Sequence, residues 1–324
     1  MTRPALGVIF HPSYSPEALV NYARRAETAG FDEVWLWEDC FLPGALTSAA
    51  TVLATTQHIR VGIGILPVVV RNPLLIAMEL TTLACLYPGR FMPGFGHGLE
   101  IWMKQIGAYP KSSLSAVEET VTAVRGLLGG KSVTLQGSYV HLENVKMERV
   151  PPQVPPLLIG AIREKSLRLA GRAGDGTILT EMSSPAYLRW AHEQIAAGMA
   201  ESGCTANQMV VYTLCKVNPD GASARQFARQ ALASRLAWSG AHLAPLGIAA
   251  EAQALLREGG VDGAARSMPE DWVDSLSASG TPEQCVTALK RLEDAGANSI
   301  VLQPIDADPD ALDEYIQFII PHLK

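Results

Sequence analysis

The feature that most constrains the fold is an alternation that runs along all 324 residues, in which each short apolar segment is followed by an amphipathic one. The apolar segments have strand length. The segments between them carry helix signals, such as Pro73 at a start and Gly30 at an end. Eight such units predict a closed parallel barrel, because right-handed crossovers place every helix outside the sheet. The expected strands are 6–10, 34–37, 59–66, 90–96, 157–160, 176–180, 209–217 and 299–303.

Two segments interrupt this alternation. Residues 132–142 have the pattern of a β-hairpin turning at Gly137 and Ser138, and residues 241–279 have no clear period, which predicts an irregular insertion. We therefore expect an α/β fold, a (β/α)8 TIM barrel forming one domain over 1–324, with insertions near 131–150 and 241–279. The alternative is an open doubly wound sheet, but the turn from His11 to Tyr14 lacks the glycines that such a fold needs after its first strand.

Composition excludes several classes of function. The net charge is −6 and no run of Lys or Arg occurs, which argues against nucleic acids and anionic membranes as partners. The longest apolar stretch, 61–70, contains Pro67 and is too short to span a bilayer. The first residues lack a signal-peptide core, and the five cysteines form no CxxC pair. We expect a cytoplasmic protein with free thiols, acting on a small molecule.

Chemistry in such a barrel takes place at the carboxyl ends of the strands. The first strand leads into His11 and the second into Glu38 and Asp39. Adjacent carboxylates at a strand exit favour a functional role, and capping of the next helix is the alternative. His97 follows the fourth strand as a candidate donor to a ligand oxygen, although a structural role is the commoner one for a histidine. No spacing typical of metal ligands is present.

Glycines follow two further strands. Gly94, Gly96 and Gly98 allow close approach of the backbone to a flat ligand, or form a simple turn. The segment from Gly160 through Ala161 and Ile162 to Arg163 leads directly into a helix, whose first amides suit a phosphate, with a solvent-facing arginine as the alternative. Thr180 and Glu181 follow the sixth strand.

Several ordered motifs together resemble one family, the luciferase-like flavin and deazaflavin oxidoreductases, most closely their coenzyme F420-dependent branch. The resemblance covers most of the chain and is strongest over roughly 5–180. The motifs that carry it are 30–35 with Glu38-Asp39, 59–67 with Arg71-Asn72-Pro73, 86–91 before 94–98, and 169–176.

The resemblance implies a barrel with the ring system of the cofactor in its mouth. Asp39 matches an acid that contacts the deazaflavin. Gly64 and Ile65 match a non-prolyl cis peptide whose bulge backs the ring. Gly160, Ala161, Ile162 and Arg163 take the place of a phosphate-binding turn, and Thr180 matches a polar position after the sixth strand. His97 and Gly98 belong to the same expected cofactor site.

Three positions depart from the pattern of the family. Cys40 stands where sugar-phosphate dehydrogenase members carry a histidine base, and Leu99 where they carry a glutamate, with Glu100 displaced by one. Arg163-Glu164 replaces a common Gly-Pro. These departures argue against hexose-phosphate oxidation. They leave His97, Glu38 and His11 as candidates for handling the proton.

The resulting hypothesis is an F420-dependent oxidoreductase that transfers a hydride between the deazaflavin and a C=C, C=N or C=O bond of a small organic substrate, or the reverse. An FMN-dependent two-component monooxygenase of the same superfamily is the first alternative, and a non-catalytic, cofactor-free barrel is the second. A homodimer is also expected, from the resemblance and from the apolar helices 47–56 and 73–86.

Overall fold

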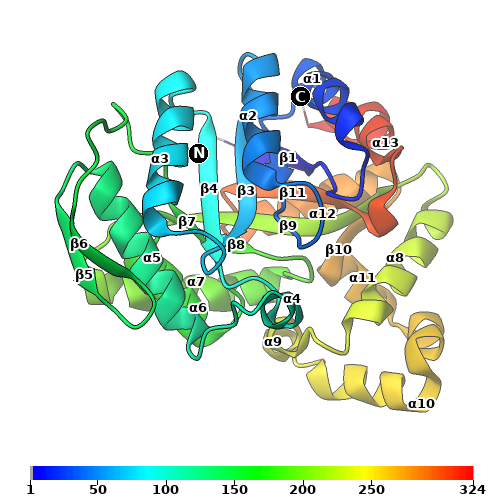
Figure 1. Cartoon of the computed structure of the whole chain (residues 1–324). Coiled ribbons are helices and arrows are strands. Elements are labelled where there is room, and N and C mark those ends of the chain that lie inside the picture. Colours follow the sequence, from blue (N-terminus) through cyan, green and yellow to red (C-terminus); the bar gives the residue numbers. More distant parts are fainter. Residues whose placement is uncertain (1–2, 324) are drawn as a thin grey trace.

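The computed structural model describes residues 3–323 and contains a closed barrel of eight parallel strands (Figure 1). The ring runs β1-β2-β3-β4-β7-β8-β9-β11 and returns to β1, because β9 pairs with β8 on one side and with β11 on the other. The predicted TIM barrel is therefore confirmed. Its strands are β1 (Ala5–Ile9), β2 (Glu33–Leu36), β3 (Arg60–Pro67), β4 (Phe91–Gly96), β7 (Leu158–Gly160), β8 (Gly176–Leu179), β9 (Gln208–Val217) and β11 (Ser299–Pro304).

Helices surround the barrel in chain order (Figure 1). They are α1 (Leu19–Ala29), α2 (Ala45–Thr55), α3 (Pro73–Leu86), α4 (Glu100–Gln105), α5 (Ser113–Leu128), α6 (Glu164–Ala173), α7 (Pro185–Ser202), α8 (Gly221–Arg235), α9 (Gly240–Leu243), α10 (Ala249–Ser267), α11 (Glu270–Leu276), α12 (Pro282–Asp294) and α13 (Ala311–Phe318). Four 3-10 turns accompany them, η1 (Pro16–Ala18), η2 (Ala244–Leu246), η3 (Ile305–Ala307) and η4 (Ile320–His322). Within residues 3–323, no helix combines the length and the apolar character needed to cross a membrane.

Strand alternation divides the apolar side chains into two layers. One set points into the barrel and forms a closed inner cluster, and the other points outward against the helices. Each fully buried large apolar side chain contributes about 1.5–3 kcal/mol, so both layers stabilise the ring of strands. The inner cluster consists of Ile9, Trp35, Met92, Leu158, Ile178, Val210, Tyr212 and Val301.

A buried carboxylate and its partly exposed cation fill the barrel at the amino ends of the strands. Glu33 accepts hydrogen bonds from Arg60 Nη2 at 2.5 Å, Trp35 Nε1 at 2.7 Å and Ser299 Oγ at 2.6 Å. The Glu33 carboxylate therefore links β2, β3 and β11 across the interior. Because side chains fill this end, the other end, where the carboxyl ends of the strands lie, is the candidate for a ligand site.

The predicted hairpin is present. β5 (Val133–Gln136) and β6 (His141–Val145) form a separate antiparallel sheet beside α5, outside the barrel (Figure 1). Glu119 on α5 fixes its turn by accepting hydrogen bonds from the amides of Ser138, Tyr139 and Val140.

The expectation of an irregular segment over 241–279 is wrong. These residues form most of α9, then η2, α10 and α11, and most of β10 (Ser277–Gly280). β10 pairs with the carboxyl-terminal part of β9, after the residues of β9 that pair with β8. Their apolar side chains pack with Leu232 and Leu236 of the α8 region into a second core that includes Trp272. The helical period is hard to detect because Gly260, at φ 59°, kinks α10.

Candidate active site

The predicted site residues converge on one end of the barrel. His11, Glu38, Asp39, His97, Gly98 and Thr180 follow the carboxyl ends of β1, β2, β4 and β8, and the segment from Gly160 to Arg163 begins at the last residue of β7. Gly64 and Ile65 lie inside β3, in its carboxyl-terminal half. The helices α4, α9 and α10 lie toward this same end, the lower one in Figure 1. We call this end the mouth.

The peptide between Gly64 and Ile65 is cis, as predicted. Both residues are half-buried, whereas the residues on either side of them in β3 are buried, so this peptide forms an open patch. The Ile65 side chain lies against Gly96 and Gly160, where an added Cβ would come within 2.8 Å and 2.9 Å of it. Glycines on two neighbouring strands thus provide the space for Ile65. A second non-prolyl cis peptide, Cys40–Phe41, was not predicted.

Three buried polar atoms near the mouth lack hydrogen-bond partners among residues 3–323. They are Trp37 Nε1 after β2, the Tyr212 hydroxyl on β9 and Gln303 Oε1 on β11. The Tyr212 hydroxyl lies directly against Gly64, since an added Cβ there would come within 2.0 Å of it. Such atoms cost free energy unless a ligand or water satisfies them. An open backbone patch among unsatisfied donors and acceptors fits a flat, polar-edged ring system.

Two carboxylates at the mouth, those of Asp39 and Glu181, interact through their charges. Burial raises the pKa of Asp39, and the nearby charge of Glu181 raises it further. Within residues 3–323, no hydrogen bond from the chain reaches either carboxylate, although Arg235 Nε lies 3.5 Å from Glu181 Oε1. Both acids therefore remain available to a ligand.

Glu38 has a different environment. Arg71 forms a bidentate ion pair with Glu38, in which Nη1 binds Oε1 and Nη2 lies 3.0 Å from Oε2. The Ala45 amide at the start of α2 also donates to Oε2 at 3.3 Å. Both carboxylate oxygens are thus engaged. Glu38 therefore links the loop after β2 to the loop after β3 and binds an amide at the start of the next helix. This contact matches the capping role that the sequence offered as the alternative to a functional one.

The two candidate histidines also differ. His11 Nδ1 accepts a hydrogen bond from the Ser13 amide at 3.2 Å, and burial lowers the pKa of the ring. A neutral His11 therefore carries its hydrogen on Nε2, and its ring meets Trp37 edge-on at 5.2 Å. His97 is exposed and its Nδ1 donates to the Gly98 carbonyl at 2.5 Å. Only His11 is packed into the wall of the mouth.

The turn from Gly160 to Arg163 is held by its own helix. Ser166 Oγ accepts hydrogen bonds from the amides of Ile162 at 3.2 Å and Arg163 at 3.0 Å. Tyr187 on α7 donates to the Ile162 carbonyl at 2.7 Å. The amides left for a phosphate are therefore those of the first turn of α6, which have no partners within the helix. The Arg163 side chain is exposed.

A buried histidine, His242, contacts the Thr180 hydroxyl. His242 on α9 places Nε2 3.3 Å from Thr180 Oγ1 and packs on the Tyr187 ring at 4.6 Å. Burial lowers the pKa of His242 to about 4, so the ring is neutral. Sequence analysis did not place His242 at the site, and its contact with Thr180 comes from the structure.

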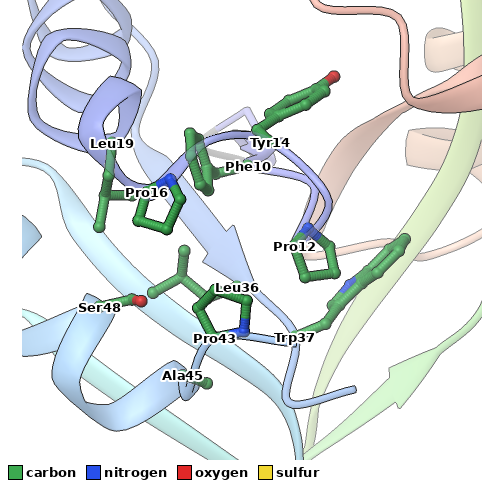
Figure 2. Close-up of a pocket in the computed structure, with 10 residues that line it drawn as sticks. All are labelled: Phe10, Pro12, Tyr14, Pro16, Leu19, Leu36, Trp37, Pro43, Ala45 and Ser48. Carbon is green, nitrogen blue, oxygen red and sulfur yellow. The ribbon is translucent and has the colours of Figure 1, made fainter. Parts of the chain in front are cut away.

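Figure 2 shows a small cavity beside the mouth, between the loops that follow β1 and β2. Its volume is about 20 Å³, which is space for about one water molecule and not for a ring system. Proline and apolar side chains form the walls, and the Trp37 ring lies beside Pro12. The cavity reflects the packing of these two loops.

Sequence analysis missed four residues of the mouth: Trp37, Tyr212, Gln303 and Arg235. The first three lie at or just beyond inward positions, two residues after Trp35, Val210 and Val301 of the inner cluster. Period-two alternation along strands already expected contained that signal. Arg235, at the end of α8, has no comparable signal.

Fold and site together define a (β/α)8-barrel protein whose candidate ligand site lies at the carboxyl ends of its strands. The family model described as luciferase-like monooxygenase matches residues 5–299, and the chain belongs to that family.

Its relatives include F420-dependent enzymes. The chain is 31% identical to the 5,10-methylenetetrahydromethanopterin reductase of Archaeoglobus fulgidus, over 98% of this chain and 99% of that protein. It is 29% identical to the F420-dependent glucose-6-phosphate dehydrogenase of Nocardia farcinica, over 96% of this chain and 95% of that protein. The solved coenzyme F420 dependent tetrahydromethanopterin reductase from Methanopyrus kandleri matches with a TM-score of 0.84 at 22% identity, over 100% of both chains. At that identity the structural likeness shows the fold.

Proposed function

We propose that this protein is an F420-dependent oxidoreductase that transfers a hydride between the deazaflavin and a small organic substrate. The observation that carries the proposal is the open backbone patch at Gly64–Ile65, which lies at the same end of the barrel as Asp39. Nearly full-length similarity to F420-dependent enzymes supports the choice of cofactor.

When bound, F420 supplies a two-electron carrier that gives or takes a hydride at a ring carbon. The residues that would hold it are Asp39 at the ring, Gly64 and Ile65 behind the ring, and the first turn of α6 after Arg163 at the phosphate. Three unsatisfied polar atoms, on Trp37, Tyr212 and Gln303, are available to polar edges of the ring or of the substrate.

The chain itself orients the reactants and excludes water. The Glu38–Arg71 ion pair fixes the loop that carries Asp39, and the Ser166 and Tyr187 hydrogen bonds fix the turn after β7. His11 stands in the wall as a neutral imidazole with a hydrogen on Nε2. These contacts hold the groups of the mouth in place before any ligand arrives, which reduces the entropy lost on binding.

The substrate class follows from the departures at Cys40 and Leu99. Leu99 is exposed and its neighbour Glu100 pairs with Lys104, so no glutamate at this point faces the mouth. Oxidation of glucose 6-phosphate is therefore not expected. We propose reduction of a C=O, C=N or C=C bond, or the reverse.

Turnover tests this assignment. Reduced F420 should be oxidised in the presence of acetone or 5,10-methylenetetrahydromethanopterin, and glucose 6-phosphate should not reduce F420. Substrate oxygenation with reduced FMN and O2, and none with F420, would replace the proposal with the monooxygenase alternative. Failure to bind either cofactor would favour a non-catalytic barrel.

We also propose that the protein forms a homodimer through α3. Leu75, Met78 and Leu86 on this helix are 52%, 49% and 63% exposed, which is unusual for large apolar residues on one helix. Contact with a second copy would remove this surface from water. The cytoplasmic location stays a prediction.

A further inference from the structure

The mouth contains several titratable groups, but most are committed to contacts within the chain. Both oxygens of Glu38 are held by Arg71 and the Ala45 amide. Nδ1 of His11 is held by Ser13 and Nδ1 of His97 by the Gly98 carbonyl, so each ring keeps only Nε2, and the His97 ring is exposed to solvent. A group that exchanges a proton with substrate needs a free atom at the mouth.

Glu181 has such an atom. It is half-buried and directly follows Thr180 at the carboxyl end of β8. Only Oε1 has a partner among the described residues, the Nε of Arg235 at 3.5 Å. The second oxygen, Oε2, has none.

The backbone that directs Glu181 is unusual. Met182 has φ 71°, a left-handed conformation that is rare for a residue with a long side chain, and it is buried in the second core. The Ser183 hydroxyl donates to the Thr180 carbonyl at 2.6 Å and closes the turn. Such conformations persist where the surroundings impose them, and they concentrate at functional sites.

Charged and titratable groups lie around Glu181. Arg235 Nε on α8 is 3.5 Å from its Oε1, and the charge of Glu181 acts on Asp39 after β2 and on Tyr212 of β9. His242 on α9 contacts the neighbouring Thr180. The Tyr212 hydroxyl is an independent pointer to a ligand, because this side chain is only 2% exposed and, apart from the neighbouring Trp37 indole, its hydroxyl has no partner within residues 3–323.

We propose that Glu181 is the catalytic residue that exchanges the proton of the substrate, with Asp39 as its partner carboxylate at the mouth. This role rests on the proposed function. In the reducing direction the hydride from the reduced deazaflavin forms the new C–H bond, and the π bond of the C=O or C=N group breaks. Its electron pair goes to the heteroatom, which takes the proton from the Glu181 carboxyl group. In 5,10-methylenetetrahydromethanopterin the bond that breaks is one C–N bond of the N–CH2–N bridge, and the released nitrogen takes the proton. Glu181 then regains a proton from solvent, and oxidation reverses each step.

The first test needs no turnover. Carbon-13 NMR of the side-chain carboxyl groups should show the Asp39 titration midpoint moving down by about half a unit or more in Glu181→Gln, because a neighbouring negative charge has gone. The exposed Glu143 on β6 offers a matched control, and Glu143→Gln should leave that midpoint unchanged. An unchanged midpoint in Glu181→Gln would overturn the pairing.

The second test is kinetic, with acetone and 5,10-methylenetetrahydromethanopterin as probes. Glu181→Gln should lower kcat about 100-fold or more and abolish one limb of the pH profile, while the F420 Kd stays within about threefold. Glu181→Asp should recover part of the rate and Glu143→Gln all of it. Loss of less than about threefold in kcat, or a wild type that binds F420 and reduces neither probe, would overturn the role. A wild type that does not bind F420 would instead defeat the proposed function, and the NMR result would still decide the pairing.

Discussion

Asp39 is the side chain on which cofactor affinity should depend most. Its carboxylate receives no hydrogen bond from the described residues and follows the carboxyl end of β2, so a ligand at the mouth can donate to it. Asp39→Ala removes one charge-assisted hydrogen bond, worth about 1.5–3 kcal/mol, and should weaken F420 binding roughly 10- to 150-fold. Fluorescence titration measures this. Wild-type affinity in the variant would mean that Asp39 does not contact the cofactor.

His242 should make stability depend on pH. Its pKa is about 4 in the folded protein and near 6.5 when unfolded, so the unfolded state binds more protons between these values. Stability is therefore complete above pH 6.5 and is lost as pH falls towards 4. The loss between about pH 7 and about pH 5 should be roughly 2 kcal/mol.

Urea unfolding at both pH values checks this prediction. His242→Phe should be less stable at neutral pH but should lose about 2 kcal/mol less on acidification than the wild type. The exposed His58 provides the control, because His58→Gln should keep the wild-type pH dependence. Equal acid sensitivity in His242→Phe would show that another group governs it.

At the scale of elements, the Glu33–Arg60 pair joins β2 to β3 at the filled end of the barrel. The Glu33 side chain is only 2% exposed while Arg60 is 36% exposed, so removing the cation leaves a carboxylate with little access to water. Arg60→Met should cost about 2 kcal/mol in the free energy of unfolding, less than for a fully buried pair.

The exposed Arg3–Asp32 pair is a suitable comparison. Arg3→Met should change stability by about 0.5 kcal/mol or less, measured by the same urea titrations. Similar costs for the two variants would contradict a special role of Glu33 in closing the barrel.

Elements with a clear period were predictable, and elements without one were not. The strand at 59–66 and the helix at 73–86 correspond to β3 and α3 within a residue, because a buried strand and Pro73 at a helix start leave strong local signals. The kinked α10 shows no such local signal. α12 was not predicted, although Thr281 and Gln284 form a capping box at its start, because no strand was expected before it.

The same contrast holds for the site. Which residues follow the strands was predictable, because parallel strands bring their carboxyl ends together. How those residues pair was not. Glu38 binds Arg71, and Glu181 lies against Arg235. These partners are on loops and helices whose positions in space the sequence does not predict. Contacts between segments far apart in the chain carry no local period.

For the whole molecule, the proposed dimer makes a direct prediction. Light scattering should give about twice the mass of one 34.7 kDa chain. The double variant Leu75→Glu, Met78→Glu places charges on the exposed face of α3 and should give monomers. Val261→Glu on the exposed surface of α10 should leave the mass unchanged. A wild type with the mass of one chain would refute the dimer. That all 324 residues form one domain stays a prediction.

The central claim is that the mouth of this barrel binds F420. Calorimetric titration of the wild-type protein with F420, and separately with FMN, tests it most directly. We predict saturable binding of one F420 per chain, weakened in Asp39→Ala, with FMN binding much more weakly. Tight binding of FMN without binding of F420 would contradict the account. So would F420 binding that is unchanged both in Asp39→Ala and in variants of the Gly64–Ile65 patch.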